Sequence, residues 1–274
     1  MSKLLLLDIS GLVHRSFHSL KVDQFKTSNN QPTNAVFGLI KTLLSLNNEF
    51  EDYTFVACCD TKKEHLWRTQ LNVNYKKQRP QTNPDLASQF PLVERCLAAA
   101  NISNIYLQGY EADDIIASIS KQNASSDVVI VSADKDMLQL LQYDHVRVYN
   151  PNKKIFVSVN DCINKYSVTP EQFTFYQTLV GDSCDNIKGV KGIGPKIAAK
   201  IVNEYKTLEN FMEQNKKYNV NNIAIDNKLV TLSTDISFQD ETFDFLKQNM
   251  YSEHFKTFCR ELEFTSILKQ LSNF

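Results

Sequence analysis

The chain has 274 residues, of which 42% are hydrophobic and 22% are charged. A chain of this length and apolar content can bury a sizeable core, which excludes an intrinsically disordered protein. Its formal net charge of -1 gives no overall sign of nucleic-acid binding. Any such function must therefore depend on where the charges lie.

The amino terminus carries a short apolar run that ends at Asp8. Its four leucines are far fewer than a membrane span or a secretory signal needs. The six cysteines contain no CxxC pair, so we interpret them as reduced, mostly buried thiols and not as a disulfide framework or a zinc site. These features predict a cytoplasmic protein without a membrane segment.

Short apolar runs that end at an acidic or polar residue alternate with longer helix-like stretches. The strand-like runs cover residues 4–8, 54–60, 105–111 and 128–134, and helical spacing is clear over 34–47 and 85–100. The runs 146–149 and 155–159, separated by Asn-Pro-Asn, predict a hairpin at the edge of a sheet. This order predicts an α/β fold with a mostly parallel twisted sheet flanked by helices on both faces.

The pattern changes after residue 168. Thr169 and Pro170 provide the N-cap and the first-position proline of a helix that we expect to reach Gly181. Residues 189–195 hold three glycines and a proline, and residues 196–205 have helical spacing. No strand-like run of comparable strength follows. We therefore divide the chain into an α/β part, residues 1–180, and a helical part, residues 181–274.

Acidic residues are the strongest functional signal. Asp8, Asp60 and Asp134 follow three predicted strands, at the sheet edge where α/β proteins bind ligands. One such aspartate alone is more simply explained as a cap for the next loop or helix, but three weaken that explanation.

Two denser clusters join them, Glu111 with Asp113 and Asp114, and Asp134 with Asp136, followed by the pair Asp182 and Asp185. Attraction to a helix amino end is an equally good explanation for the first cluster taken alone. So many hard oxygen ligands, without histidine or thiol partners, suit Mg²⁺ or Mn²⁺. The spacing thus predicts a metal-dependent phosphoryl-transfer site.

These motifs closely resemble the 5′ nuclease family, which includes the 5′ to 3′ exonuclease domain of bacterial DNA polymerase I, phage 5′ exonucleases and flap endonucleases. The similar segments, in the family's order, are LLLLDISGLVHRSFH, FVACCD, WRTQLNVNYKKQR, GYEADDII, VSADKDM and GDSCDNIKGVKGIGPKIAAKI. The resemblance implies that nine carboxylates hold two metal ions: Asp8, Asp60, Glu111, Asp113, Asp114, Asp134, Asp136, Asp182 and Asp185. It also suggests that Asp182 and Asp185 belong with the second ion.

The basic run from Lys62 to Arg79 has six Lys or Arg residues and one acid. By itself it is best explained as a solvated loop. The resemblance instead implies a helical arch, at about residues 62–90, above the metals. In it Lys76 and Arg79 would act on the phosphate together with Arg15, whereas Arg68 and Tyr75 would contact DNA or, for Tyr75, brace the arch. For His18 we leave two interpretations open, a packed core residue and a ligand contact.

The segment IKGVKGIGPKIAAK resembles the family's helix-three-turn-helix, whose glycines let backbone N–H groups approach duplex phosphates. This implies DNA contacts from Lys188, Lys191, Gly192, Gly194, Lys196 and Lys200, and suggests K⁺ as a ligand of the turn. The sequence departs from the family at Ile9, where glycine is usual, and at His14, where an aromatic residue is usual. The second departure affects how a terminal base would stack.

The resemblance implies a stand-alone 5′ to 3′ exonuclease and 5′ flap endonuclease that acts on DNA in replication and repair. We expect it to act as a monomer, to remove RNA primers on DNA as well as flaps, and to share a pathway with a DNA polymerase. Two alternatives remain, a catalytically inactive DNA-binding protein and an RNA-directed nuclease. The complete acidic set argues against the first, and the duplex-binding segment argues against the second.

Overall fold

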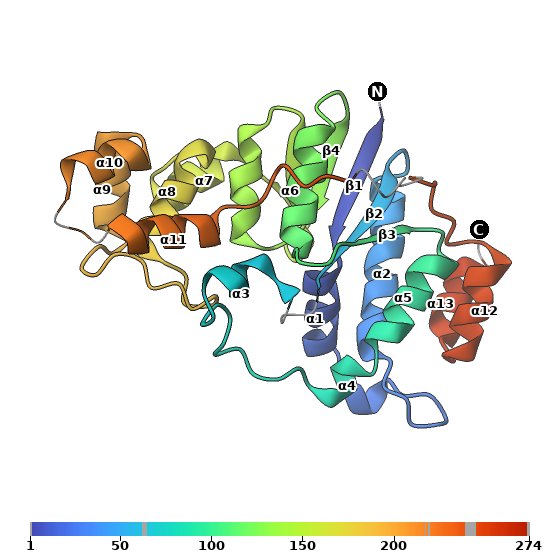
Figure 1. Ribbon diagram of the computed structural model, residues 1–274. Helices are drawn as coiled ribbons and strands as arrows, with labels where there is room; N and C mark the ends of the chain where they lie inside the picture. The colour runs from blue at the N-terminus through green and yellow to red at the C-terminus, as the bar shows by residue number, and fades with distance from the viewer. Residues whose placement is uncertain (1, 62–64, 217, 219, 239–244, 273–274) are drawn as a thin grey trace.

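The computed structural model describes residues 2–61, 65–216, 218, 220–238 and 245–272 (Figure 1). The strands are β1 (Lys3–Asp8), β2 (Thr54–Cys59), β3 (Ser103–Tyr106), β4 (Asp127–Val131), β5 (Val146–Asn150) and β6 (Ile155–Val157). The helices of the first half are α1 (Ile9–Ser19), η1 (Val22–Gln24), α2 (Asn34–Glu49), α3 (Trp67–Leu71), α4 (Pro84–Ala87), α5 (Phe90–Ala99), α6 (Ala112–Gln122) and η3 (Lys135–Gln142). The later helices are α7 (Val159–Tyr166), α8 (Pro170–Val180), α9 (Pro195–Tyr205), α10 (Leu208–Gln214), α11 (Val220–Val230), α12 (Glu253–Glu261) and α13 (Thr265–Leu271).

The six strands form one sheet in the order β3-β2-β1-β4-β5-β6. All neighbours are parallel except β6, which forms the predicted antiparallel hairpin with β5 at the edge. Leu7 pairs with both Ala57 and Val131, so β1, β2 and β4 end at nearly the same level. The predicted α/β fold is confirmed, and the residues that follow these three strands share one edge of the sheet.

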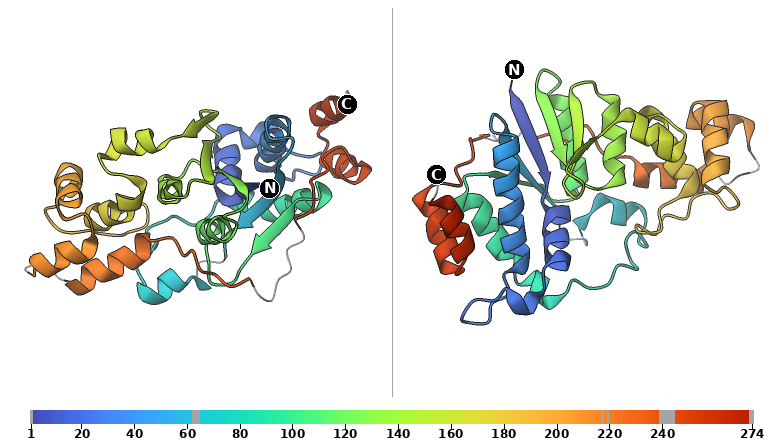
Figure 2. Two further views of the ribbon diagram at one scale, coloured as in Figure 1. Left: turned by 90° about the horizontal axis from the view of Figure 1, so that it is seen from above. Right: turned by 180° about the vertical axis from the view of Figure 1, so that it is seen from behind.

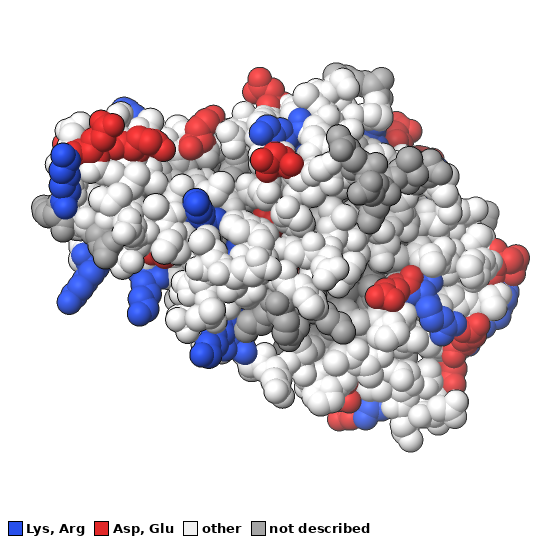
Figure 3. All heavy atoms as spheres, viewed as in Figure 1, with Lys and Arg blue, Asp and Glu red and all other residues white. Residues whose placement is uncertain are grey.

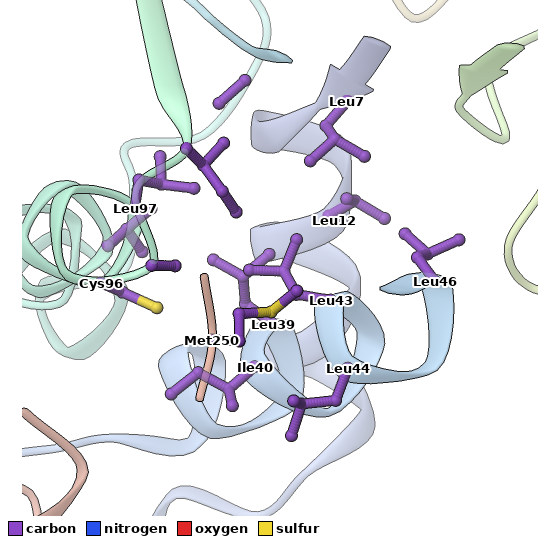
Figure 4. Packing of buried hydrophobic residues seen from close by; sticks show 14 of the residues in the cluster. Leu7, Leu12, Leu39, Ile40, Leu43, Leu44, Leu46, Cys96, Leu97 and Met250 are labelled. Atoms are coloured by element: carbon purple, nitrogen blue, oxygen red, sulfur yellow. The ribbon is translucent and has the colours of Figure 1, made fainter. Parts of the chain in front are cut away.

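The sheet lies between two layers of helices (Figures 1 and 2). Alternate residues of its strands face opposite layers. Leu5 and Leu7 of β1 pack with α1, α2 and α5, whereas Leu4 and Leu6 pack with α6 and η3. All four leucines are buried. Figure 4 shows the first of these cores, where Leu39 and Leu43 of α2 lie beside Leu12 of α1. Full burial of one leucine side chain stabilises the fold by roughly 1.5–3 kcal/mol.

A third core lies within the helices α7 to α11. Phe173 of α8 and Phe211 of α10 are fully buried there together with Val202 of α9. Helix α8 begins where the sequence predicts, because Thr169 and Gln172 form a capping box and Pro170 occupies the first turn. The helical character of this part of the chain follows from these local signals.

Three features differ from the predictions. The predicted helix 85–100 is two helices, because the chain leaves the helix at Ser88 and Gln89 and Pro91 starts α5 afresh. The run 105–111 forms a strand only up to Tyr106. Helices α12 and α13 contribute Phe255 and Ile267 to the first core, so residues 181–274 are not one packed unit. The division at residue 180 itself stays a prediction.

All six cysteines are free; Cys58, Cys96, Cys162 and Cys259 are buried, and Cys184 is exposed. In the described part of the chain, no helix combines the length and the apolar character that a membrane span requires.

Candidate metal centre and nucleic-acid interface

Asp8 lies at the end of β1 and caps α1. Its carboxylate accepts hydrogen bonds from the Gly11 N–H at 2.8 Å and the Ser132 hydroxyl at 2.9 Å. A Cβ at position 11 would lie 2.4 Å from Asp8 Oδ2, so only glycine leaves room for this cap. Asp60 is fixed in a similar way at the end of β2, because it accepts the Ala112 N–H at 2.7 Å.

Four carboxylates form a first group beneath the sheet edge: Asp8, Asp60, Asp113 and Asp134. Burial, and then the charge of Asp60, raises the pKa of Asp8 to about 6. Burial, and then the charges of Asp8, Asp134 and Asp60, raises the pKa of Asp113 well above its usual value. Acids that perturb one another in this way lie close together, and a cation among them would relieve the repulsion.

Three carboxylates form a second group: Asp136, Asp182 and Asp185. One oxygen from each lies within 4.8 Å of the others, which is close enough for a single cation to bind all three. Burial, and then the charge of Asp134, raises the pKa of Asp136 to about 7. Asp134 therefore interacts with both groups, and the two candidate cation sites are adjacent.

A tight loop positions Asp182 and Asp185. The backbones of Asp182 and Ile187 exchange two hydrogen bonds of 2.8 Å, which close the loop. Gly181 and Gly189 flank it with φ angles of +78° and +66°. A Cβ at Gly181 would lie 2.5 Å from the Ile187 carbonyl oxygen, so both the backbone conformation and the close approach require glycine here.

Cations cover this acidic centre. A cavity of about 360 Å³ is lined by six of the nine predicted acids together with Lys76, Arg79 and Lys135. Lys76 forms an ion pair with Glu111 and lies 3.6 Å from Asp185. Arg79 forms an ion pair of 2.6 Å with Asp185. The basic segment after α3 thus contacts the carboxylates. It is not the predicted helical arch throughout, because residues 72–83 between α3 and α4 contain no α-helix. Residues 62–64 of the basic run lie outside the described residues.

The structure contradicts the prediction that Asp114 is a metal ligand. Asp114 is fully buried, and both of its oxygens accept hydrogen bonds from Arg68, at 2.5 and 2.8 Å. The Ser233 N–H donates to it as well, at 2.9 Å. Its side chain therefore neutralises an internal arginine and does not line the cavity.

Arg68 is likewise not a DNA contact. It is only 2% exposed, and its guanidinium also donates to Glu111 and to the carbonyl oxygens of Leu229 and Thr231. These contacts tie α3 to α6 and to the end of α11. Arg68 is a structural residue, because no donor group faces the solvent.

Tyr75 is also 2% exposed, so its ring cannot stack on a base. Its hydroxyl lies 2.9 Å from Glu111 and 3.0 Å from Asp185. Burial and these two carboxylates raise its pKa, so the phenol stays neutral. Of the two interpretations of Tyr75, the structure supports the brace of the arch segment.

Helix α1 carries three polar residues that the sequence analysis considered, His14, Arg15 and His18. Arg15 is half-buried, and its Nη1 atom is buried without a hydrogen-bond partner among the described residues. His18 is exposed and meets the edge of Phe17, so it is not a packed core residue. His14 is exposed as well and stacks on His18 at 6.4 Å.

The predicted helix-three-turn-helix residues form an exposed basic turn. Lys188, Lys191, Lys196 and Lys200 are all exposed, and Gly194 precedes the first turn of α9. Gly192 has a φ of +87°, a conformation that favours glycine. In Figure 3, Lys and Arg side chains project over the segment between α8 and α9. The positive end of the α9 dipole and the nearby lysines suit a phosphate backbone. Pro195 has no N–H, and the Ile197 and Ala198 N–H groups already donate to the Gly194 carbonyl oxygen.

Three site residues were not found from the sequence. Ser132 donates to Asp8, Gln177 donates to Asp136 at 2.6 Å, and Lys135 forms an ion pair of 2.9 Å with Asp182. The position of Lys135 between two acids was a usable signal. Gln177 lies on the inner face of α8 and gave no signal, because its partner is 41 residues away.

A mostly parallel sheet with an acidic cavity at the carboxyl ends of its strands is an arrangement that suits an α/β enzyme dependent on divalent cations. Residues 3–167 match the family described as 5′-3′ exonuclease, N-terminal resolvase-like domain, and residues 168–253 match 5′-3′ exonuclease, C-terminal SAM fold. The chain therefore belongs to the 5′-3′ exonuclease family.

Two relatives show how much of a known protein this chain matches. A 5′-3′ exonuclease of Aquifex aeolicus is 35% identical over 285 residues, which cover 99% of this chain and 96% of that protein. DNA polymerase I of Caldicellulosiruptor bescii is 33% identical over 287 residues, which cover 98% of this chain but 33% of that longer protein.

Solved structures share the fold. The D15 protein of bacteriophage T5, crystallised with metal ions, has a TM-score of 0.67 at 21% identity and covers 95% of this chain and 98% of its own. Flap endonuclease-1 of Methanococcus jannaschii has a TM-score of 0.65 at 15% identity and covers 99% of this chain and 91% of its own. At these identities the similarity shows the fold alone.

Proposed function

We propose that this chain is a two-metal-dependent 5′ to 3′ exonuclease and 5′ flap endonuclease that hydrolyses DNA phosphodiester bonds. One observation carries the proposal: acids of both adjacent carboxylate groups line one cavity, and cations from the arch segment overhang it. The T5 D15 flap endonuclease, which shares the fold, was crystallised with DNA and metal ions.

The donor set fits hard divalent cations. Every candidate ligand is a carboxylate, and the two groups meet at Asp134. Burial, and then repulsion between the acids, raises the pKa values of Asp8 and Asp136. We assign Mg²⁺ or Mn²⁺ to both sites because oxygen ligands suit these ions. When bound, such a pair supplies an activated water and stabilises the leaving oxygen. Asp8, Asp60, Asp113 and Asp134 would hold the first ion, and Asp136, Asp182 and Asp185 the second. Glu111 would join the first ion because, unlike Asp114, it lines the cavity.

The residues around the cavity would position the phosphate. Lys76 and Arg79 lie over the carboxylates and offer donors to the scissile phosphate from above. Arg15 would contact a neighbouring phosphate, because its buried Nη1 atom has no partner among the described residues. A buried donor without a partner is costly, and a phosphate oxygen would satisfy it.

Replacing Lys76 tests the arch. We expect Lys76→Ala to slow single-turnover cleavage of a 5′ flap at least about tenfold, on the order of 1.4 kcal/mol in barrier, because this ammonium acts mainly in the transition state. Binding in Ca²⁺ should change much less. Lys77→Ala, which changes an exposed lysine beside it, is the matched control and should cleave at the wild-type rate. A defect confined to binding would contradict this role.

Replacing Lys196 and Lys200 tests whether these lysines bind duplex DNA. Each lysine is exposed on α9, so its loss should weaken binding to flap and plain duplex alike. Each lost phosphate contact should reduce the salt slope of log K by roughly 0.9. Lys256→Ala on α12, at the opposite end of the molecule in Figure 1, should leave the slope unchanged. Unchanged slopes for all three variants would place the duplex elsewhere.

A digest of three substrates tests the function as a whole. Purified protein with Mg²⁺ should shorten a 5′-flap DNA and a duplex with a free 5′ end, and EDTA should stop both reactions. Structured RNA without DNA should resist. Binding of flap DNA without any cleavage in Mg²⁺ or Mn²⁺ would favour the inactive DNA-binding alternative, and preferential cleavage of the RNA would favour an RNA-directed nuclease.

Several finer features belong to the same proposal. We infer a monomer in the cytoplasm that removes flaps and RNA primers in replication and repair, alongside a DNA polymerase. Support comes from the relatives, since the polymerase I proteins contain a region similar to this chain. K⁺ is the proposed ligand of the glycine-rich turn. Residues 1–180 would carry the chemistry, and the turn and α9 within residues 181–274 would bind the duplex.

A further inference from the structure

Lys135 is the cation that enters the acidic centre from the side of the sheet. It follows Asp134 and begins η3, whereas Lys76 and Arg79 reach the centre from the segment after α3. Its ammonium lies 2.9 Å from Asp182 Oδ2. The other oxygen of Asp182 accepts the Cys184 N–H at 2.8 Å. Both oxygens of Asp182 are thus occupied by donors of the chain itself.

The negative charges of the three acids of the second group are stabilised by different partners. Asp185 pairs with Arg79, and Asp136 accepts a hydrogen bond from the neutral amide of Gln177. Asp182 is 7% exposed in its side chain, and Lys135 is its one ion-pair partner within the described ranges. Lys135 therefore supplies the positive charge that compensates the buried Asp182 carboxylate.

A metal ion bound to this group would need an oxygen of Asp182, and the donors of Lys135 and Cys184 already engage both of them. A divalent cation and an ammonium at hydrogen-bond distance from one carboxylate oxygen repel each other strongly in a partly buried site. The Lys135 ammonium has space to move away from Asp182 when an ion binds. Its side chain is 38% exposed and also lines a neighbouring cavity of about 370 Å³ beside Tyr166. A lysine ammonium on its flexible stem can make such a move.

We propose that Lys135 occupies the place of the second metal ion in the metal-free protein and competes with that ion for Asp182. It thereby sets the metal concentration at which the second site fills, and acts as a positioning residue. This inference rests on the proposed metal-dependent function.

The test is Lys135→Met, which removes the charge but keeps an unbranched chain. Titration with Mn²⁺, followed by calorimetry and by electron paramagnetic resonance of the free ion, should show the weaker of two sites binding about tenfold tighter or more. The tighter site should not change. Lys135→Arg keeps the charge and should stay within about threefold of wild type. Lys165→Met changes an exposed lysine of the neighbouring cavity and should match wild type.

Thermal unfolding provides the readout that a purely structural role would not give. In EDTA, Lys135→Met should unfold at a lower temperature than wild type, because Asp182 then lacks a cation. Saturating Mn²⁺ should remove this difference. An equal loss of stability in both conditions, or Mn²⁺ affinity that is unchanged or weaker in Lys135→Met, would overturn the inference. If wild type binds no Mn²⁺ at all, the result contradicts the proposed metal-dependent function itself, and with it the inference about Lys135.

Discussion

Asp134→Asn is expected to lower single-turnover cleavage at least about a hundredfold, since even partners outside the ligand shell contribute 10–100-fold. Asp134 perturbs carboxylates of both groups, so its charge serves both candidate cation sites. The substitution keeps the shape of the side chain. It also keeps an oxygen that can accept the Asp136 N–H, now 2.9 Å from Oδ1, so η3 should remain capped.

The measurement is cleavage of a 5′ flap at saturating enzyme and Mg²⁺, paired with DNA binding in Ca²⁺. Affinity should survive, because the variant also loses a negative charge beside the phosphates. Asp144→Asn, at an exposed acid beyond the end of η3, is the control and should behave as wild type. Turnover close to wild type in Asp134→Asn would remove this residue from the metal centre.

Arg68→Ala should destabilise the protein by about 3–5 kcal/mol, the cost of removing one partner of a buried ion pair. Asp114 would then hold a buried charge without its partner, and the carbonyl oxygens of Leu229 and Thr231 would lose their donors. Urea unfolding should show a lower midpoint with a similar slope. Lys77→Ala, at an exposed position, should stay within about 0.5 kcal/mol of wild type.

A double-mutant cycle locates the cause. Asp114→Ala should also destabilise the fold, and the double variant should lose less than the sum of the two single losses, because neither charge is then stranded. The opposite pattern, normal stability with weakened DNA binding in Arg68→Ala, would restore Arg68 as a DNA contact and contradict the buried arrangement.

The order of strands and helices could be predicted from the sequence because it depends on local patterns. Residues 4–8 are apolar and end at an acid, and Thr169 with Pro170 specifies the start of α8 from within one turn of chain. The alternation of strands with helices predicts a parallel sheet. In such a sheet Asp8 and Asp60, which lie at the carboxyl ends of their strands, share one edge. The acidic centre was therefore foreseeable from residues near the strand ends.

Which acids belong to that centre was decided by tertiary structure. Asp113 and Asp114 are adjacent in sequence, but successive residues of a helix point about 100° apart, so one faces the first carboxylate group and the other faces Arg68. Arg68 and Asp114 are separated by 46 residues. Lys135 meets Asp182 because the Asp182–Ile187 hydrogen bonds, with Gly181 and Gly189 on either side, close the loop that carries Asp182. Local sequence patterns specify the helices and strands and identify candidate charged residues. Which of these charges form pairs depends on distances that exist only after the chain has packed.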